Sequence, residues 1–144
     1  MMHQNNKIKL NRSSKHVKAL LRNQAIHFIK FGLLKTTTAR VKAVRSLVER
    51  VVTIAKKGGN HFNTIRALKK VLPYGHGIAE RLIKDIAPVF ATRPGGYTRI
   101  NKLMHRQSDT AKISMMTWVE EIDPMVPVYD KSKLTKVANT TENN

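Results

Sequence analysis

The sequence predicts an α+β fold in which about four helices pack with a small antiparallel β-sheet. Between residues 15 and 86, apolar side chains recur at spacings of three and four, the period of helices with one buried face. After Pro88 this period is lost and two short segments of strand character follow. Both ends are polar. At 144 residues we therefore expect one domain at 15–123, between a basic arm at 1–14 and an irregular, flexible extension at 124–144.

The first predicted helix runs from Lys15 to about Phe31. Gly32 occupies the position typical of a helix C-terminus. Ser13 or Ser14 is expected to cap its start, since a serine hydroxyl accepts from the free N–H groups of a first turn.

The second predicted helix follows an extended, threonine-rich stretch that starts at Leu33. The helix ends near Lys57. Thr36, Thr37 and Thr38 supply candidate N-cap oxygens. One face of this helix is cationic and the other is apolar. The apolar residues expected to be buried are Val41, Val44, Val48, Val51 and Ala55.

Two shorter helices and two strands complete the prediction. The helices are expected from Phe62 to Leu72 and from Ile78 to about Ile86, where Pro88 stops the second one. The strands are expected from Tyr97 to Leu103 and from Ile113 to Val119, as an antiparallel pair packed on the helices. The buried face of the third helix is expected to hold Phe62, Ile65, Leu68 and Leu72.

The charge balance indicates a polyanionic partner. The chain has 27 Lys and Arg against 9 Asp and Glu, a formal net charge of +18. The excess is uneven, because residues 1–70 contain 17 of the bases and a single acid, Glu49. Such a field attracts nucleic acid first and an anionic membrane only as a distant second. The first half is therefore expected to face the polyanion.

Composition argues against several other classes of protein. There is no cysteine, which excludes disulfides and thiolate zinc sites and favours an intracellular compartment. No apolar run approaches the ~20 residues of a membrane span. The six histidines lack metal-ligand spacing, and paired carboxylates, a nucleophile elbow and a phosphate-cradling loop are missing. We therefore expect no enzyme activity, metal, cofactor, small-molecule substrate or membrane partner.

The stretch from Arg93 to Arg99 has two interpretations of about equal weight. Gly95 and Gly96 leave backbone N–H groups unshielded, arginines flank them, and Tyr97 offers a flat ring. That combination suits a phosphodiester backbone, with bidentate arginine contacts and tyrosine stacking. It is also what a turn at the start of a strand looks like, with arginines that are merely exposed.

The cationic helix faces raise a similar choice between binding and simple solvation. Solvated faces usually mix signs of charge, and seventeen bases against one acid do not, so binding is favoured. RNA and DNA are not distinguished at this point, because the phosphate contribution does not depend on sequence.

Three segments together resemble one family. Leu10 to Asn23 resembles the amino-terminal signature of the bacterial-type large-subunit ribosomal protein L-seventeen family. Leu34 to Lys42 is similar to the family's second signature, and Arg93 to Ile100 is similar to its Gly-Gly-Tyr-Thr-Arg box, with Arg106 at a matching position further on. Order and spacing agree over roughly residues 1–123.

The resemblance implies a non-catalytic α+β protein that binds large-subunit ribosomal RNA, supports subunit assembly and translation, and lies beside other large-subunit proteins. It implies a place on the ribosome of the bacterial cytoplasm, or alternatively of a mitochondrion or plastid. The matched positions implied to contact RNA are Arg12, Ser13, His16, Arg22, Asn23, Lys35, Thr36, Thr37, Arg40, Lys42, Arg93 and Arg99. Further contacts predicted in the same three segments and just after them are Lys18, Arg45, Gly95, Gly96, Tyr97 and Arg106.

The rival hypothesis is a free nucleoid or regulatory DNA-binding protein built on consecutive short helices. Its distinguishing feature would be a helix-turn-helix with a short turn. The stretch from Gly32 to Thr38 is too long and too extended for that turn. An enzyme acting on RNA is a weaker third hypothesis, because the acids and metal ligands are missing.

Overall fold

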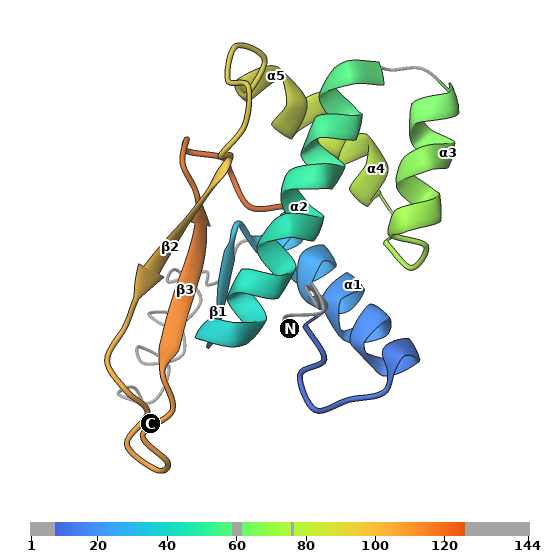
Figure 1. The fold of residues 1–144 in the computed structure, drawn as a ribbon. Helices are drawn as coiled ribbons and strands as arrows, with labels where there is room; N and C mark the ends of the chain where they lie inside the picture. Colours follow the sequence, from blue (N-terminus) through green and yellow to red (C-terminus); the bar gives the residue numbers. More distant parts are fainter. Residues whose placement is uncertain (1–7, 59–61, 76, 126–144) are drawn as a thin grey trace, which may run out of the picture.

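The computed structural model describes residues 8–58, 62–75 and 77–125, and Figure 1 shows it as a ribbon. Its strands are β1 (Leu33–Thr37), β2 (Thr98–Lys102) and β3 (Ile113–Trp118). Its helices are α1 (Ser14–Phe31), α2 (Thr38–Gly58), α3 (Phe62–Val71) and a continuous helical segment made of α4 (Ile78–Arg81), η1 (Leu82–Ile86) and α5 (Ala87–Val89). The predicted α+β fold, with about four helices and a small antiparallel sheet, is confirmed.

The sheet has three strands in the order β1–β3–β2, and both neighbouring pairs are antiparallel. Strands β2 and β3 are the two predicted strands, slightly shortened at their ends. The third strand is the extended stretch before α2, for which the sequence indicated no sheet partner. In β1, Leu34 lies opposite Met116 of β3, and both side chains are buried. The sheet therefore joins the first third of the chain to the last.

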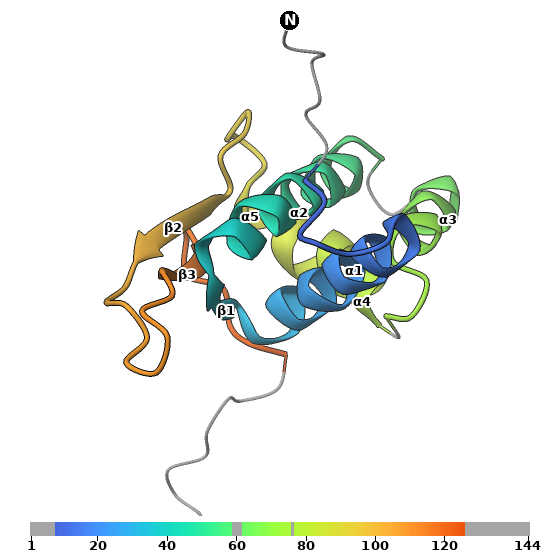
Figure 2. The same cartoon turned by 60° about the horizontal axis from the view of Figure 1, so that its bottom comes forward.

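Helix α2 lies between the sheet and the other long helices. In Figures 1 and 2 the sheet is on one side of α2, while α1 and α3 are on the other. The apolar face predicted from spacing is confirmed, because each of its five members has 0% of its surface exposed: Val41, Val44, Val48, Val51 and Ala55.

An aromatic cluster connects the sheet to the helices. Strand β3 alternates buried and half-buried side chains, as a strand with one face on a core does. The Trp118 ring centroid lies 4.4 Å from that of Phe28 in α1 and 5.8 Å from that of Phe90, the residue after α5. Phe90 in turn lies 5.1 Å from Tyr97. These contacts hold three parts of the chain in one core.

The prediction that Phe62 is buried is wrong. Phe62 is the first residue of α3 and is 68% exposed, whereas Leu68, further along the same helix, is 1% exposed. Helical spacing places a residue on a face, but it does not show whether another element covers that part of the face. Phe62 instead contacts Arg66, whose Cζ atom lies 5.7 Å from the ring centroid.

The prediction that Pro88 ends a helix is also wrong. A proline in a regular helix clashes with the carbonyl four residues earlier and lacks an N–H. Here η1 is a π-helical turn, and the Ala87 N–H donates to the Leu82 carbonyl, five residues back. Pro88 then sits in the first turn of α5, where no N–H is required of it. The helix therefore continues to Val89.

The C-terminal end of α1 and that of the described chain lie close together. Gly32 ends α1 as predicted, with φ at 70° and its N–H donating to the Phe28 carbonyl. After β3, the buried Arg81 donates to the Asp123 carbonyl, and the Met125 N–H donates to the Lys30 carbonyl at 2.7 Å. Most of the proposed arm and extension, residues 1–7 and 126–144, lies outside the described residues.

Candidate nucleic-acid interface

The start of α1 carries the first group of predicted contacts. Ser13 is the N-cap, since its hydroxyl accepts from the His16 N–H at 3.4 Å, as one of the two predicted serines should. Arg12 Nη1 lies 3.3 Å from His16 Nε2. These three side chains are exposed, as are Lys18 and Asn23, while Arg22 is half-buried. The cap thus fixes a polar, cationic helix start at the surface.

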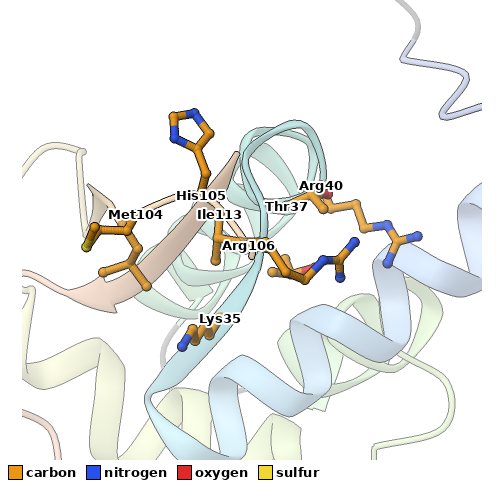
Figure 3. Close-up of a pocket in the computed structure, with 9 residues that line it drawn as sticks. Lys35, Thr37, Arg40, Met104, His105, Arg106 and Ile113 are labelled. Carbon is orange, nitrogen blue, oxygen red and sulfur yellow. The ribbon is translucent and has the colours of Figure 1, made fainter. Parts of the chain in front are cut away.

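The junction of β1 and α2 forms one wall of a hollow of about 590 Å³. Figure 3 shows Lys35, Thr37 and Arg40 on this wall, and Arg106 from the β2–β3 loop facing them. In that view the guanidinium groups of Arg40 and Arg106 extend toward the same side. His105 also lines the hollow. The fold therefore brings together five predicted contacts, which are Lys35, Thr36, Thr37, Arg40 and Arg106.

Thr38 has a different role from the predicted helix cap. Its hydroxyl donates to the Lys112 carbonyl at 3.1 Å and lies 2.8 Å from the Ser114 hydroxyl oxygen. Its N–H donates to the same Lys112 carbonyl at 3.0 Å. Thr38 thus fixes the start of α2 to β3, which keeps the hollow's two walls in register.

Glu49 is the acid that the charge pattern singled out without a role. Its carboxylate accepts from the Tyr97 N–H at 3.1 Å, from the Thr98 N–H at 3.1 Å and from the Thr98 hydroxyl at 2.8 Å. It also lies 3.7 Å from Nε of Arg45, one turn earlier on α2. Glu49 therefore positions both the start of β2 and one of the predicted RNA contacts.

The stretch from Arg93 to Arg99 is a turn with a buried tyrosine. Gly96 has φ at 67°, a conformation that favours glycine, and both glycines are exposed. Tyr97 is only 1% exposed, and its hydroxyl donates to the Pro94 carbonyl at 3.4 Å. The ring is packed in the core, so the predicted stacking of Tyr97 on RNA is contradicted.

The two arginines of this turn differ in their surroundings. Arg99 is exposed on β2. Arg93 donates to a Glu120 carboxylate oxygen at 2.9 Å, and its carbonyl accepts from Lys56 Nζ at 2.6 Å. Lys56 Nζ also lies 5.4 Å from the Tyr97 ring centroid. Contacts within the protein therefore explain the conformation of the turn. Its two glycines and the side chains of Arg93 and Arg99 remain accessible at the surface.

Arg106 is held by a carboxylate in its own loop. It donates to the two Asp109 oxygens at 2.8 and 2.5 Å, and Asp109 also accepts from the Ala111 N–H at 3.2 Å. The hydrogen bond from Arg106 and the one from Ala111 lower the pKa of Asp109 to about 2. The same pairing raises the pKa of Arg106. The guanidinium is thereby oriented while its side chain stays 53% exposed.

The remaining predicted contacts lie outside the hollow. Lys42 and Arg45 are exposed on the first turns of α2. Lys18 and Arg22 line a second hollow, between α1, α2 and α3, with Arg50 and Lys70. Neither Arg50 nor Lys70 is in the predicted contact set. The cationic face of each helix identifies Arg50 and Lys70 only when it is also known which helices pack against one another.

Other kinds of site find no support in the described part of the chain. Within residues 8–58, 62–75 and 77–125, no group of three His, Cys, Asp or Glu is arranged to hold a metal ion. No helix in the same residues has the length and apolar character needed to cross a membrane. Because β1 stands between α1 and α2, these two helices do not form a helix-turn-helix.

The fold and its surfaces define a small, strongly basic α+β protein, and comparison with known proteins gives its family. A family model described as Ribosomal protein L17 matches residues 20–119. The chain is 41% identical over 112 residues to the "Large ribosomal subunit protein bL17" of Akkermansia muciniphila, covering 78% of this chain and 80% of that protein. The protein of that name from Clostridium botulinum is 39% identical over 113 residues, covering 77% and 96%. That from Methylacidiphilum infernorum is 38% identical over 120 residues, covering 83% and 89%.

The chain belongs to the ribosomal protein L17 family. The resemblance drawn from the three sequence segments is thereby confirmed. The matched region includes α2, α3, the continuous helical segment and all three strands, together with most of α1.

Proposed function

We propose that this chain is a structural constituent of the large ribosomal subunit that binds large-subunit rRNA and supports subunit assembly and translation. The observation that carries the proposal is the hollow at the β1–α2 junction. It gathers Lys35, Arg40 and Arg106 from two distant segments, with Thr36 and Thr37 between them. Family membership supports the same function.

The mechanism is electrostatic docking followed by hydrogen bonding. Arginine guanidinium groups bind phosphate oxygens in a bidentate manner, and each neutralised phosphate releases condensed counterions. Threonine hydroxyls at the same hollow are suited to hydrogen bonds with phosphate or with the ribose 2′-hydroxyl. The core holds the β1–α2 wall in place, and Asp109 orients Arg106 in its loop, so little ordering of these groups is needed on binding.

The other predicted contacts extend this surface. The capped start of α1 presents Arg12 and His16, and α2 presents Lys42 and Arg45. Arg93 and Arg99 flank the glycine turn. Partners are then large-subunit rRNA and the neighbouring ribosomal proteins. The place of action is the ribosome of the bacterial cytoplasm, in keeping with the bacterial relatives.

Removal of charges from α2 tests the mechanism. In a variant with Arg40, Lys42 and Arg45 all changed to Gln, the negative slope of log K against log salt for large-subunit rRNA should become shallower by roughly two to three. Binding would be measured by filter retention between low and physiological salt. Circular dichroism would check folding, and Lys84→Gln, an exposed lysine on η1, is the control. A folded triple variant with the wild-type slope would refute the proposal.

Fractionation of cell extracts on sucrose gradients tests the cellular role. The full chain should migrate with large subunits and stay there through a moderate salt wash. A free or DNA-associated pool would instead support the rival hypothesis of a nucleoid or regulatory protein.

A further inference from the structure

The hollow between α1, α2 and α3 has the chemistry of a polyanion site. Its volume is about 490 Å³, and cations stand on all three of its walls: Lys18 and Arg22 on α1, Arg50 on α2, and Lys70 on α3. Partly buried apolar residues, among them Leu21, form its floor. None of the described residues that line it is an acid. We call this hollow the helical groove.

The cations of the helical groove lack a carboxylate partner, unlike three of the arginines predicted to contact RNA. Arg45, Arg93 and Arg106 each lie within 4 Å of a Glu or Asp, at 3.7, 2.9 and 2.5 Å. Among the residues the structure describes, none of the four groove cations has an ion-pair partner. Four like charges gathered from three helices repel one another, and a bound polyanion would relieve that repulsion.

The outer face of α3 adds an aromatic side chain at the other end of the helix from Lys70. Phe62 is 68% exposed, and Arg66 lies over its ring, with Cζ 5.7 Å from the centroid. Lys69 and Lys70 are exposed in the last turn of the same helix. An exposed ring beside arginine and lysine is the combination that stacks unpaired bases and binds their phosphates.

We propose that the helical groove and the outer face of α3 form a second RNA-binding surface, which takes a segment containing at least one unpaired nucleotide. The sheet and α3 lie on opposite sides of α2 (Figures 1 and 2). One copy of the protein therefore holds two separate segments of rRNA, one in the groove and one at the β1–α2 hollow. The inference rests on the proposed function and extends it, because the protein then bridges two parts of the folded RNA.

Directed cleavage of RNA tests the bridge. The chain has no cysteine, so single-cysteine variants accept an iron chelate at one chosen position. Lys69→Cys places the chelate on α3, Gln107→Cys places it in the β2–β3 loop, and Val89→Cys on α5 is the control, beside the acids Asp85 and Glu121. Each full-length variant is bound to the complete large-subunit rRNA of the same organism, and hydroxyl radicals are generated.

We expect positions 69 and 107 to give two sets of RNA cuts that do not overlap. Cuts from 69 no stronger than those from the Val89→Cys control would overturn the proposal and leave the proposed function standing. Cuts from 69 that coincide with those from 107 would overturn the bridge. The absence of cuts from both positions would count against rRNA binding itself, so the two failures are distinguishable.

Affinity measurements test the chemistry of the groove. Arg50→Gln combined with Lys70→Gln removes two charges from exposed positions. The negative slope of log K against log salt should therefore become shallower by about two. Phe62→Ala should weaken binding about tenfold at every salt concentration without changing the slope, because stacking is not ionic. Lys84→Gln should change neither quantity. A wild-type slope in the double variant, or wild-type affinity in Phe62→Ala, would contradict the proposed chemistry.

Discussion

The helical layer and the β2–β3 hairpin hold their cations in different ways. On the helices, the apolar face of α2 is completely buried and the cations project from a backbone that the core already fixes. In the hairpin, every residue from 101 to 110 is exposed, so no core lies beneath the loop. Its arginine is fixed instead by Asp109, through two hydrogen bonds within the loop.

This difference indicates where each surface is sensitive to mutation. A cation on a helix can be replaced without changing the scaffold, because packing on the other face holds the helix. Arg106 in the hairpin loop instead depends on Asp109 for its orientation. Glu49 connects the two regions, since it belongs to α2 and accepts hydrogen bonds from the first residues of the hairpin. The comparison therefore predicts large effects at Glu49 and progressively smaller ones toward the surface.

Among the charged residues, the largest effect is expected from Glu49→Ala. The substitution leaves the N–H groups of Tyr97 and Thr98 without their acceptor and removes the partner of the Thr98 hydroxyl. Loss of hydrogen bonds to a charged, partly buried group should lower the free energy of unfolding by about 2 to 3 kcal/mol. Urea denaturation followed by circular dichroism measures this. Glu80→Ala, an exposed acid on α4, is the control, and equal effects of the two would contradict the role given to Glu49.

The helices were predictable because their signals are local. Spacing identified the buried face of α2, and Gly32 and Ser13 marked the ends of α1. The role of Glu49 was not predictable, since its partners lie 48 and 49 residues further along the chain. The same reason applies to β1, which pairs with β3 near the other end of the described chain. Sequence patterns reveal what a segment prefers, and long-range pairing depends on the whole fold.

The candidate site was predictable in its segments and not in its geometry. The segments before α2 and after β2 were identified, and the structure shows that Arg40 and Arg106 share one hollow. For Tyr97 the sequence leaves two interpretations of about equal weight, because a ring that suits RNA stacking suits a core equally well, and its burial excludes stacking. Arg50 and Lys70 were not selected, because each becomes notable only when α2 and α3 meet.

A smaller effect is expected from Phe62→Ala, which compares the surface and core faces of α3. Because Phe62 is 68% exposed, its removal should change the free energy of unfolding by less than about 0.5 kcal/mol. Leu68→Ala on the inner face of the same helix, where Leu68 is 1% exposed, should cost about 2 to 5 kcal/mol. Thermal and urea denaturation measure both. A large loss of stability in Phe62→Ala would mean that the ring packs in the core, and it would remove the basis for a stacking role.

The smallest effect on the whole molecule is expected from titration of Asp109, which should change the hairpin loop alone. The pKa of Asp109 is lowered from 3.8 to about 2. The stabilisation of the loop is therefore fully present above about pH 4 and is lost as the pH falls through 2. Carbon-detected NMR of the carboxyl group should show a midpoint near 2, and Arg106→Gln should return it toward 3.8, because Arg106 is the main cause of the shift. Amide exchange should quicken in the loop and stay unchanged in α2. A wild-type midpoint near 3.8 would show that the carboxylate does not hold the arginine, and the hairpin cation would then resemble those of the helices.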